Sequence, residues 1–154
     1  MRFIQVGVGG FGNCWVNVLK NSPDAEVVGL VDLSDAALKS ACEVGGYDAS
    51  SCFSSLEEAL ATVQADAVVC ATPPAIHEHD VVTALEAGLH AISEKPMSDN
   101  LDACKRMLAA AARTGKTYCV SQNYRYSPAT WTMAQQIQAG DLGPVGQVKI
   151  DFFK

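Results

Sequence analysis

The chain has 154 residues, of which 49% are hydrophobic and 18% charged, and its formal net charge is −6. That length fits one compact domain with a core of its own. The 11 basic residues and the acidic balance argue against nucleic acid or an anionic membrane surface as a partner. No apolar run approaches the roughly 18 residues of a membrane span. The first residues enter a strand pattern without a signal peptide, so we expect a cytoplasmic protein.

The cysteines and histidines form no pattern typical of a metal site or a disulfide framework. Six cysteines are scattered along the chain without a Cys-x-x-Cys pair, and most have apolar neighbours. We therefore expect free thiols in a reducing compartment. None of the three histidines has a cysteine at zinc-finger spacing, so no metal site is predicted.

The first part of the chain predicts three strands separated by helices. Apolar runs place the strands at residues 4–8, 26–31 and 51–53. A helix follows the first strand, and its spacing predicts a buried face made of Phe11, Cys14, Trp15, Val18 and Leu19. Ser34 is the predicted cap of a helix that reaches Cys42, and a capping box of Ser54 and Glu57 predicts a helix that reaches Thr62.

The second part continues the alternation. Strands are predicted at residues 66–71, 89–93 and 117–121, and helices at 75–87 and 128–139. A long helix is predicted to start at Ser98 and to stop at Gly115. Its spacing predicts an apolar face made of Leu101, Cys104, Met107, Leu108, Ala111 and Ala112.

This alternation predicts an α/β fold in residues 1–145: a doubly wound, mostly parallel sheet with helices on both faces. The last residues differ, because Val148, Ile150 and Phe152 alternate with polar side chains. Such alternation is typical of a sheet covered on one side only. We interpret residues 146–154 as the first strand of a second domain whose remainder is absent. The exposed apolar strand would then be disordered, pair with a second copy of the chain through residues 146–153, or cause aggregation.

The glycine-rich turn after the first strand carries the main chemical signal. Between a strand and a helix, Gly7, Gly9 and Gly12 form a G-x-G-x-x-G motif that also includes Gly10 and Phe11. This context is typical of a Rossmann-type dinucleotide site, in which the diphosphate lies at the helix N-terminus.

Asp32 ends the second strand, twenty positions after Gly12, where such folds bind the adenosine ribose. A carboxylate there favours NAD over NADP, because it repels the 2′-phosphate of NADP and no Lys or Arg follows it closely. An S-adenosylmethionine-dependent methyltransferase could use a similar turn and acid, and it remains an alternative.

Further motifs resemble the glucose–fructose oxidoreductase / inositol dehydrogenase / MocA family of nicotinamide oxidoreductases, and this resemblance spans essentially the whole chain. Besides the glycine motif and Asp32, the similar segments are Ala-Thr-Pro-Pro-x-x-His at 71–77, Ala-Gly-Leu-His at 87–90, Glu-Lys-Pro at 94–96 and Gln-Asn-Tyr-Arg-Tyr-Ser-Pro at 122–128. The last two, at this separation, are far more specific than the glycine motif.

The resemblance implies roles for individual residues. Lys95 would be the catalytic lysine, which binds the substrate oxygen and helps to move its proton. Glu94 would lie on the cofactor side of it. The other residues implied at the cofactor are Ala71, Thr72, Pro73 and His77 near the nicotinamide ribose, and Asn123 and Arg125 across the site. Surface or purely structural roles for Lys95, His77 and Arg125 are the simpler alternatives.

Members of this family carry a second, sheet-based domain that contacts the substrate, and residues 1–154 lack it. The resemblance therefore implies the NAD-binding domain of an oxidoreductase acting on a sugar, cyclitol or related polyol, which alone would turn over little or nothing. A stand-alone NAD-binding module without catalysis remains the alternative from another class.

Overall fold

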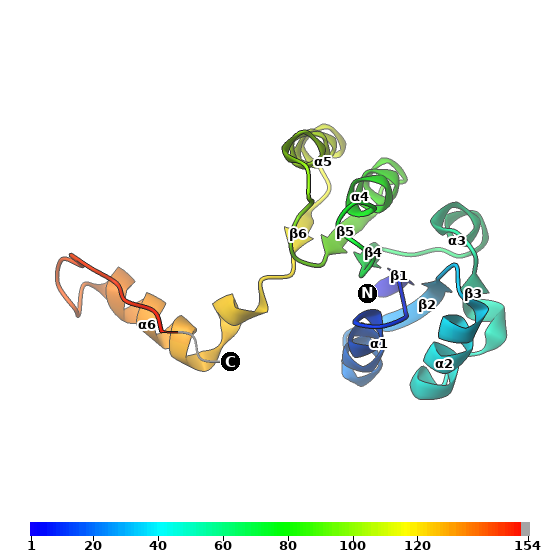
Figure 1. The fold of residues 1–154 in the computed structure, drawn as a ribbon, viewed down its shortest axis with the longest axis horizontal. Coiled ribbons are helices and arrows are strands. Elements are labelled where there is room, and N and C mark those ends of the chain that lie inside the picture. Colours follow the sequence, from blue (N-terminus) through cyan, green and yellow to red (C-terminus); the bar gives the residue numbers. More distant parts are fainter. Residues whose placement is uncertain (152–154) are drawn as a thin grey trace. The chain divides into compact units, whose positions relative to one another are not determined.

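The computed structural model describes residues 1–151 and divides the chain into two compact units, Met1–Ser121 and the segment from Gln122 onward. The first unit contains one six-stranded sheet (Figure 1). Its strands are β1 (Arg2–Val6), β2 (Glu26–Val31), β3 (Cys52–Phe53), β4 (Ala67–Cys70), β5 (His90–Ser93) and β6 (Tyr118–Val120). All neighbouring pairs are parallel, in the order β3-β2-β1-β4-β5-β6, which confirms the predicted doubly wound sheet.

The register brings the carboxyl ends of the central strands to one edge. Val6, at the end of β1, pairs with Val31 at the end of β2 and with Cys70 at the end of β4. The loops that leave these three strands therefore start side by side. Because the strand order reverses next to β1, this edge is where parallel sheets form their ligand crevice.

Helices cover both faces of the sheet. They are α1 (Gly12–Asn21), α2 (Asp35–Gly45), α3 (Leu56–Thr62), α4 (His77–Glu86) and α5 (Leu101–Thr114), with a short 3₁₀ helix, η1 (Ala49–Ser51). Figure 1 shows α1 and α2 on one face and α3, α4 and α5 on the other. Among residues 1–151, no helix is long and apolar enough to cross a membrane.

Hydrophobic clusters lie on both faces of the sheet. Along β1, Phe3 packs with Leu19 of α1, whereas Ile4 packs with Leu85 of α4 and Met107 of α5. All five side chains are buried. A strand covered on both faces reads as a continuous apolar run, which is why the sequence predicts these strands well.

Several predicted helix starts and helix faces were wrong. The capping box lies one residue later than predicted, because the Ser55 hydroxyl accepts from the Glu58 amide while the Glu58 carboxylate accepts from the Ser54 amide. Asn100, not Ser98, caps α5, since its side chain accepts from the amides of Asp102 and Ala103.

The predicted buried faces of α1 and α5 were rotated from the true ones. In α1, Val18 is exposed and Val16 is buried, and in α5 Leu101 and Leu108 are 72% and 58% exposed. Gly12 and Ala103 lie on the buried faces instead. Gly12 is buried because α1 begins close to the glycine loop, where a Cβ would lie 2.1 Å from the carbonyl oxygen of Gly7.

The second unit contains a 3₁₀ helix, η2 (Asn123–Tyr126), and helix α6 (Pro128–Ala139). Pro128 suits the start of this helix, because the first backbone amides of a helix have no partner within it and proline has no amide hydrogen to leave unpaired. The rings of Tyr126 and Trp131 stack with centroids 6.3 Å apart. Residues 146–151 are assigned to no helix or strand, and Phe152 lies outside the described residues, so the first strand expected at 146–154 stays a prediction. The predicted pairing of this segment with a second copy stays a prediction, as does the domain boundary at residue 145.

Candidate functional site

The glycine loop depends on the absence of side chains at two positions. At Gly7, with φ of +81°, a Cβ would lie 2.7 Å from the carbonyl oxygen of Ala71. At Gly12 it would lie 2.1 Å from the carbonyl oxygen of Gly7. Gly9 differs, because its nearest neighbours within the protein would be at 3.5 Å or more. Gly7 and Gly12 are therefore needed by the fold, whereas Gly9 leaves a surface open to a ligand.

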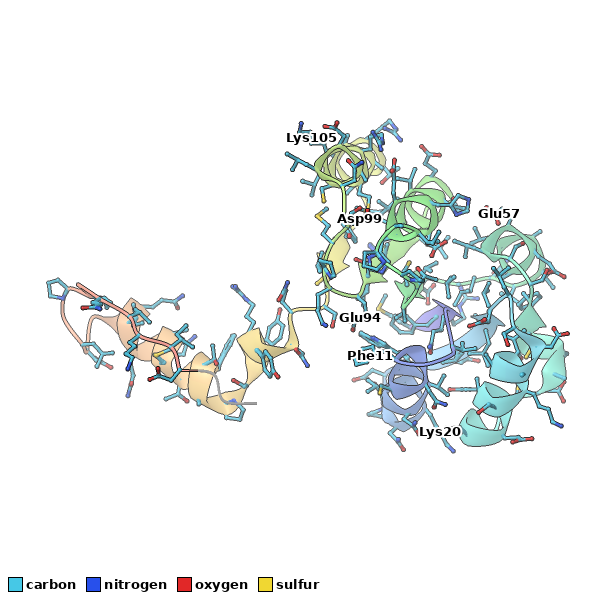
Figure 2. The ribbon with its side chains drawn as sticks, viewed as in Figure 1. Phe11, Lys20, Glu57, Glu94, Asp99 and Lys105 are labelled. Atoms are coloured by element: carbon cyan, nitrogen blue, oxygen red, sulfur yellow. The ribbon has the colours of Figure 1, made fainter. Side chains whose placement is uncertain are left out.

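The amide groups at the start of α1 are available to an anion. The backbone N–H groups of Gly10 and Phe11 have no hydrogen-bond partner among the described residues. Phe11 is the N-cap of α1, and its side chain is exposed (Figure 2). Unpaired amides at the positive end of a helix are suited to a phosphate group.

Gln5 supports this loop from inside β1, and the sequence analysis missed it. Its side chain is fully buried, and Nε2 donates to the carbonyl oxygens of Gly7 at 3.1 Å and Gly12 at 2.7 Å. Its Oε1 is buried and has no partner in the described part of the chain. The signal was a lone polar residue within an apolar strand, since such a side chain must find partners in a core.

Asp32 lies at the end of β2 and contacts the glycine loop. Its Oδ2 accepts from the amides of Val8 at 2.9 Å and Gly9 at 3.2 Å, and Oδ1 accepts from the amide of Ser34 at 2.9 Å. The carboxylate thus joins the loop after β1 to the loop after β2. It is only partly buried, so it remains accessible to hydroxyl groups of a ligand.

A pocket of about 480 Å³ opens beside Asp32 at the carboxyl edge of the sheet. Six residues predicted at the cofactor line it: Gly7, Gly9, Asp32, Ala71, Thr72 and Pro73. The segments after β3 and β4, including the first turns of α3 and α4, add residues that the sequence analysis missed, among them Ser54, Ser55, Glu57, Ile76, His79 and Asp80. Mostly apolar walls with a few polar groups, in a space of this size, are typical of small-ligand sites.

The polar side of the pocket is acidic. Asp80 is nearly buried and its Oδ2 accepts from Thr72 Oγ1 at 2.8 Å. Burial raises the pKa of the Asp80 carboxyl, and its hydrogen bonds with Thr72 and His79 oppose that rise. His79 also lies 3.3 Å from Glu57 Oε1. None of the described residues that line the pocket is Lys or Arg.

His77 does not line the pocket beside Asp32, and its predicted contact with the nicotinamide ribose stays a prediction. The side chain is fully buried, with Nε2 2.8 Å from the carbonyl oxygen of Thr72. Its Nδ1 lies 3.1 Å from the carbonyl oxygen of Pro96 and 3.2 Å from that of Met97. His77 therefore connects the loop after β4 to the loop after β5, and its role is to position both.

Glu94 and Lys95 lie on the loop after β5. Glu94 Oε1 accepts from the indole Nε1 of Trp15 at 2.9 Å, which fixes this loop against α1, and Figure 2 shows Glu94 there. The Lys95 side chain is exposed, and the Lys95–Pro96 peptide bond is cis. Neither residue lines the pocket beside Asp32, so they form a separate part of the same carboxyl edge.

Asn123 and Arg125 belong to η2 in the second unit, whereas the pocket beside Asp32 belongs to the first. Arg125 is exposed and makes no ion pair with a carboxylate of the described part of its own unit, residues 122–151. Among residues 1–151, no group of three metal-ligating side chains comes together. The predicted roles of Asn123 and Arg125 at the cofactor stay predictions.

The first unit thus offers three complementary features along one edge: unpaired amides, a carboxylate and an apolar pocket. The amides suit a phosphate, the carboxylate suits ribose hydroxyls and the pocket suits a flat, apolar base. Gly9, at their centre, leaves room for a diphosphate to approach the backbone. These residues therefore fit a dinucleotide.

Comparison with known proteins leads to the same group of proteins. A family model described as the oxidoreductase family with an NAD-binding Rossmann fold matches residues 1–122. An uncharacterized protein of Sinorhizobium fredii is 33% identical over 98% of this chain and 43% of its own length. A 4-carboxy-2-hydroxymuconate-6-semialdehyde dehydrogenase of a Sphingobium species is 30% identical over 92% of this chain and 44% of its own. The chain therefore spans less than half the length of these curated relatives.

Comparison with solved structures also identifies dehydrogenases as similar proteins. The WlbA dehydrogenase of Bordetella pertussis, in complex with NADH and UDP-GlcNAcA, matches with a TM-score of 0.82 and 31% identity, over 92% of this chain and 43% of that one. An apo scyllo-inositol dehydrogenase of Lactobacillus casei matches with a TM-score of 0.85 at 21% identity, over 93% and 43%, which shows the fold alone. The chain belongs to the Gfo/Idh/MocA oxidoreductase family, and residues 1–122 form that family's NAD-binding Rossmann fold.

Proposed function

We propose that the chain is the cofactor-binding part of an NAD-dependent oxidoreductase that acts on a carbinol carbon of a sugar, cyclitol or related polyol. One observation carries the proposal. The Asp32 carboxylate is bonded to the glycine loop at the mouth of an apolar pocket, next to the unpaired amides that precede α1. An adenosine ribose bound in this pocket would meet Asp32, and its diphosphate would meet the amides of Gly10 and Phe11.

The charges at the pocket support NAD rather than NADP. Asp32, Glu57 and Asp80 all line it, and no Lys or Arg lies among its described lining residues. Leu33, which follows Asp32, is 94% exposed and offers no hydrogen bond from its side chain. A 2′-phosphate placed there would be repelled by carboxylates without a compensating cation.

Lys95 is our candidate for the catalytic group. Its amine is exposed on the loop that Trp15 fixes through Glu94, so it is free to reach a substrate oxygen. We assign it to hold the proton of the substrate hydroxyl and to stabilise the charge that develops on that oxygen. A bound nicotinamide would supply the hydride chemistry.

The substrate class is inferred from relatives. An inositol 2-dehydrogenase of Corynebacterium glutamicum is 27% identical over 93% of this chain, and a D-apiose dehydrogenase of Paraburkholderia graminis is 28% identical over 90%. The chain covers 42% and 36% of these proteins. We therefore propose that residues 1–154 bind the cofactor but turn over little alone, because a substrate must be fixed against the nicotinamide for efficient transfer.

Thermal unfolding with separate ligands tests the cofactor class. Saturating NADH should raise the Tm, because a ligand at about 100 times its Kd stabilises the folded state by about 2.7 kcal/mol. S-adenosylmethionine at the same concentration should leave the Tm unchanged. A rise with S-adenosylmethionine alone would contradict the proposal and favour a methyltransferase-like domain.

The reading frame beyond residue 154 separates an oxidoreductase from a stand-alone module. Continued coding sequence with the pattern of a sheet domain supports the oxidoreductase. A stop codon directly after residue 154 would favour the module without catalysis.

A further inference from the structure

Two cysteines of the first unit come together where α2 packs beside β3. Cys42 lies in the last turns of α2, and Cys52 is the first residue of β3. Their Sγ atoms are 3.1 Å apart, and both side chains are half-buried. All six cysteines are free thiols, and no other pair of sulfur atoms is in contact among residues 1–151. This pair is therefore distinct from the scattered thiols that the sequence predicts.

The backbone on both sides of the pair is fixed by hydrogen bonds. The amides of Gly46 and Tyr47 both donate to the carbonyl oxygen of Cys42, at 2.7 and 3.1 Å. Asp48 Oδ1 accepts from the amide of Ser50 and so caps η1, which leads directly into Cys52. The short loop between the two cysteines thus holds them in place. A disulfide bond, about 2.05 Å long, needs the sulfur atoms to approach by only about 1 Å.

Small molecules can reach this pair. A hollow of about 450 Å³ is lined by both cysteines together with Lys39, Glu43 and Tyr47. None of the residues that line it also lines the pocket beside Asp32. The hollow is large enough to admit a small oxidant without disturbing the cofactor site.

We propose that Cys42 and Cys52 are a redox-active pair that closes into an intramolecular disulfide and joins α2 to β3. The oxidant would be a small disulfide of the glutathione class. The Cys42 thiolate attacks one sulfur of that disulfide and releases one glutathione thiolate, which leaves a mixed disulfide on Cys42. Cys52 loses its proton, attacks the Cys42 sulfur and expels the second glutathione. Two protein thiols are oxidised, and one disulfide is reduced to two thiols.

The order of attack follows from the surroundings of the two sulfur atoms. Burial and the neighbouring Cys42 thiol raise the pKa of the Cys52 thiol to about 11. We assign the first attack to Cys42 and the second to Cys52, whose thiol is the more difficult to deprotonate because of its burial. The proposal does not depend on the proposed function, because the pair lies outside the cofactor site.

Peptide mapping tests the pair directly. The wild-type chain is incubated with oxidised glutathione, its remaining thiols are blocked with N-ethylmaleimide in denaturant, and it is digested with an endopeptidase that cleaves after Glu. Cleavage after Glu43 and Glu57 separates Cys42, in peptide 27–43, from Cys52, in peptide 44–57. We expect these two peptides to be joined, with the mass of their sum less two hydrogen atoms. Cys104→Ser should keep this product, and Cys42→Ser should abolish it.

Thermal unfolding checks that the disulfide suits the folded structure. The oxidised wild type should unfold about 5–10 °C above the reduced wild type, because closing a short loop restricts the unfolded chain. Two results would overturn the proposal: glutathione that remains on Cys42 without transfer to Cys52, or modification confined to the exposed Cys14 and Cys119. A lower Tm after oxidation would also overturn it, since it would show that the folded chain opposes the bond.

Discussion

Gly12 and Gly9 belong to the same loop, but replacing each with alanine should have different effects: Gly12→Ala should lower stability, and Gly9→Ala should weaken cofactor binding. In Gly12→Ala the new Cβ would lie 2.1 Å from the carbonyl oxygen of Gly7, where ordinary contacts begin at 3.4 Å. Relieving this overlap requires α1 and the loop to separate by about 1 Å. Overpacking of this kind costs about 3 kcal/mol and lowers the Tm of a chain of this size by about 10 °C.

Gly9→Ala should leave the fold intact and weaken cofactor binding. Its Cβ would meet Ala37 at 3.5 Å and Asp32 at 3.8 Å, which are ordinary contacts, and the backbone there does not need a positive φ. The free energy of unfolding should stay the same or rise by up to about 1 kcal/mol. The methyl group would instead occupy the path of the diphosphate. Losing one charged hydrogen bond of about 1.5–3 kcal/mol weakens NADH binding by about 10–100-fold.

Urea unfolding and fluorescence titration with NADH measure these two effects on the same preparations. Gly9→Ala should weaken NADH binding without lowering the free energy of unfolding, whereas Gly12→Ala should lower the free energy of unfolding. Wild-type NADH affinity in Gly9→Ala would refute the placement of the diphosphate over this loop. Wild-type stability in Gly12→Ala would refute the close approach of α1 to the loop after β1.

The remaining predictions concern two buried side chains. His77→Phe should lower the free energy of unfolding by about 2–4 kcal/mol in urea, because it removes the hydrogen bond that the fully buried ring donates to a backbone carbonyl and leaves that carbonyl unpaired. A change below about 0.5 kcal/mol would contradict the positioning role. In the folded chain the pKa of the Asp80 carboxyl is raised above its value of 3.8 in the unfolded chain. The unfolded chain therefore loses this proton first, and the contribution of Asp80 to the free energy of unfolding falls as the pH rises above about 4. The Tm of Asp80→Asn relative to wild type should therefore be higher at about pH 7.5 than at about pH 4, and an equal difference at both would contradict the raised pKa.

The sequence was sufficient for the features that depend on local patterns. Strands covered on both faces read as apolar runs, and the positions of Gly7, Gly12 and Asp32 follow from the strand–turn–helix context. The predicted sheet, the glycine loop and the acid at the end of β2 are all present in the structure. The glycine loop is local in sequence, and the strand–helix–strand spacing places Asp32 although it contacts Val8 from 24 residues away.

Contacts between distant loops were not predictable in the same way. His77 meets carbonyl groups about twenty residues further along, and a helix period does not show that its ring is buried there. Ser54 and Asp80 reach the pocket only because β3 and β4 end at the same edge of the sheet. The predicted buried face of α5 was wrong because the helix exposes Leu101 and Leu108 to solvent and packs through Ala103. All three side chains are apolar, so apolarity alone does not distinguish the two faces.

The central claim is that Asp32 and the glycine loop bind NAD. Calorimetric titration of NADH and NADPH into the wild type and Asp32→Ala tests it most directly, because the ratio of the two affinities does not change through a general loss of loop structure. The account predicts that the wild type binds NADH at one site and more tightly than NADPH. In Asp32→Ala, NADH affinity should fall by about 10–100-fold and the preference over NADPH should shrink. No NADH binding to the wild type, or an unchanged preference in Asp32→Ala, would contradict the account.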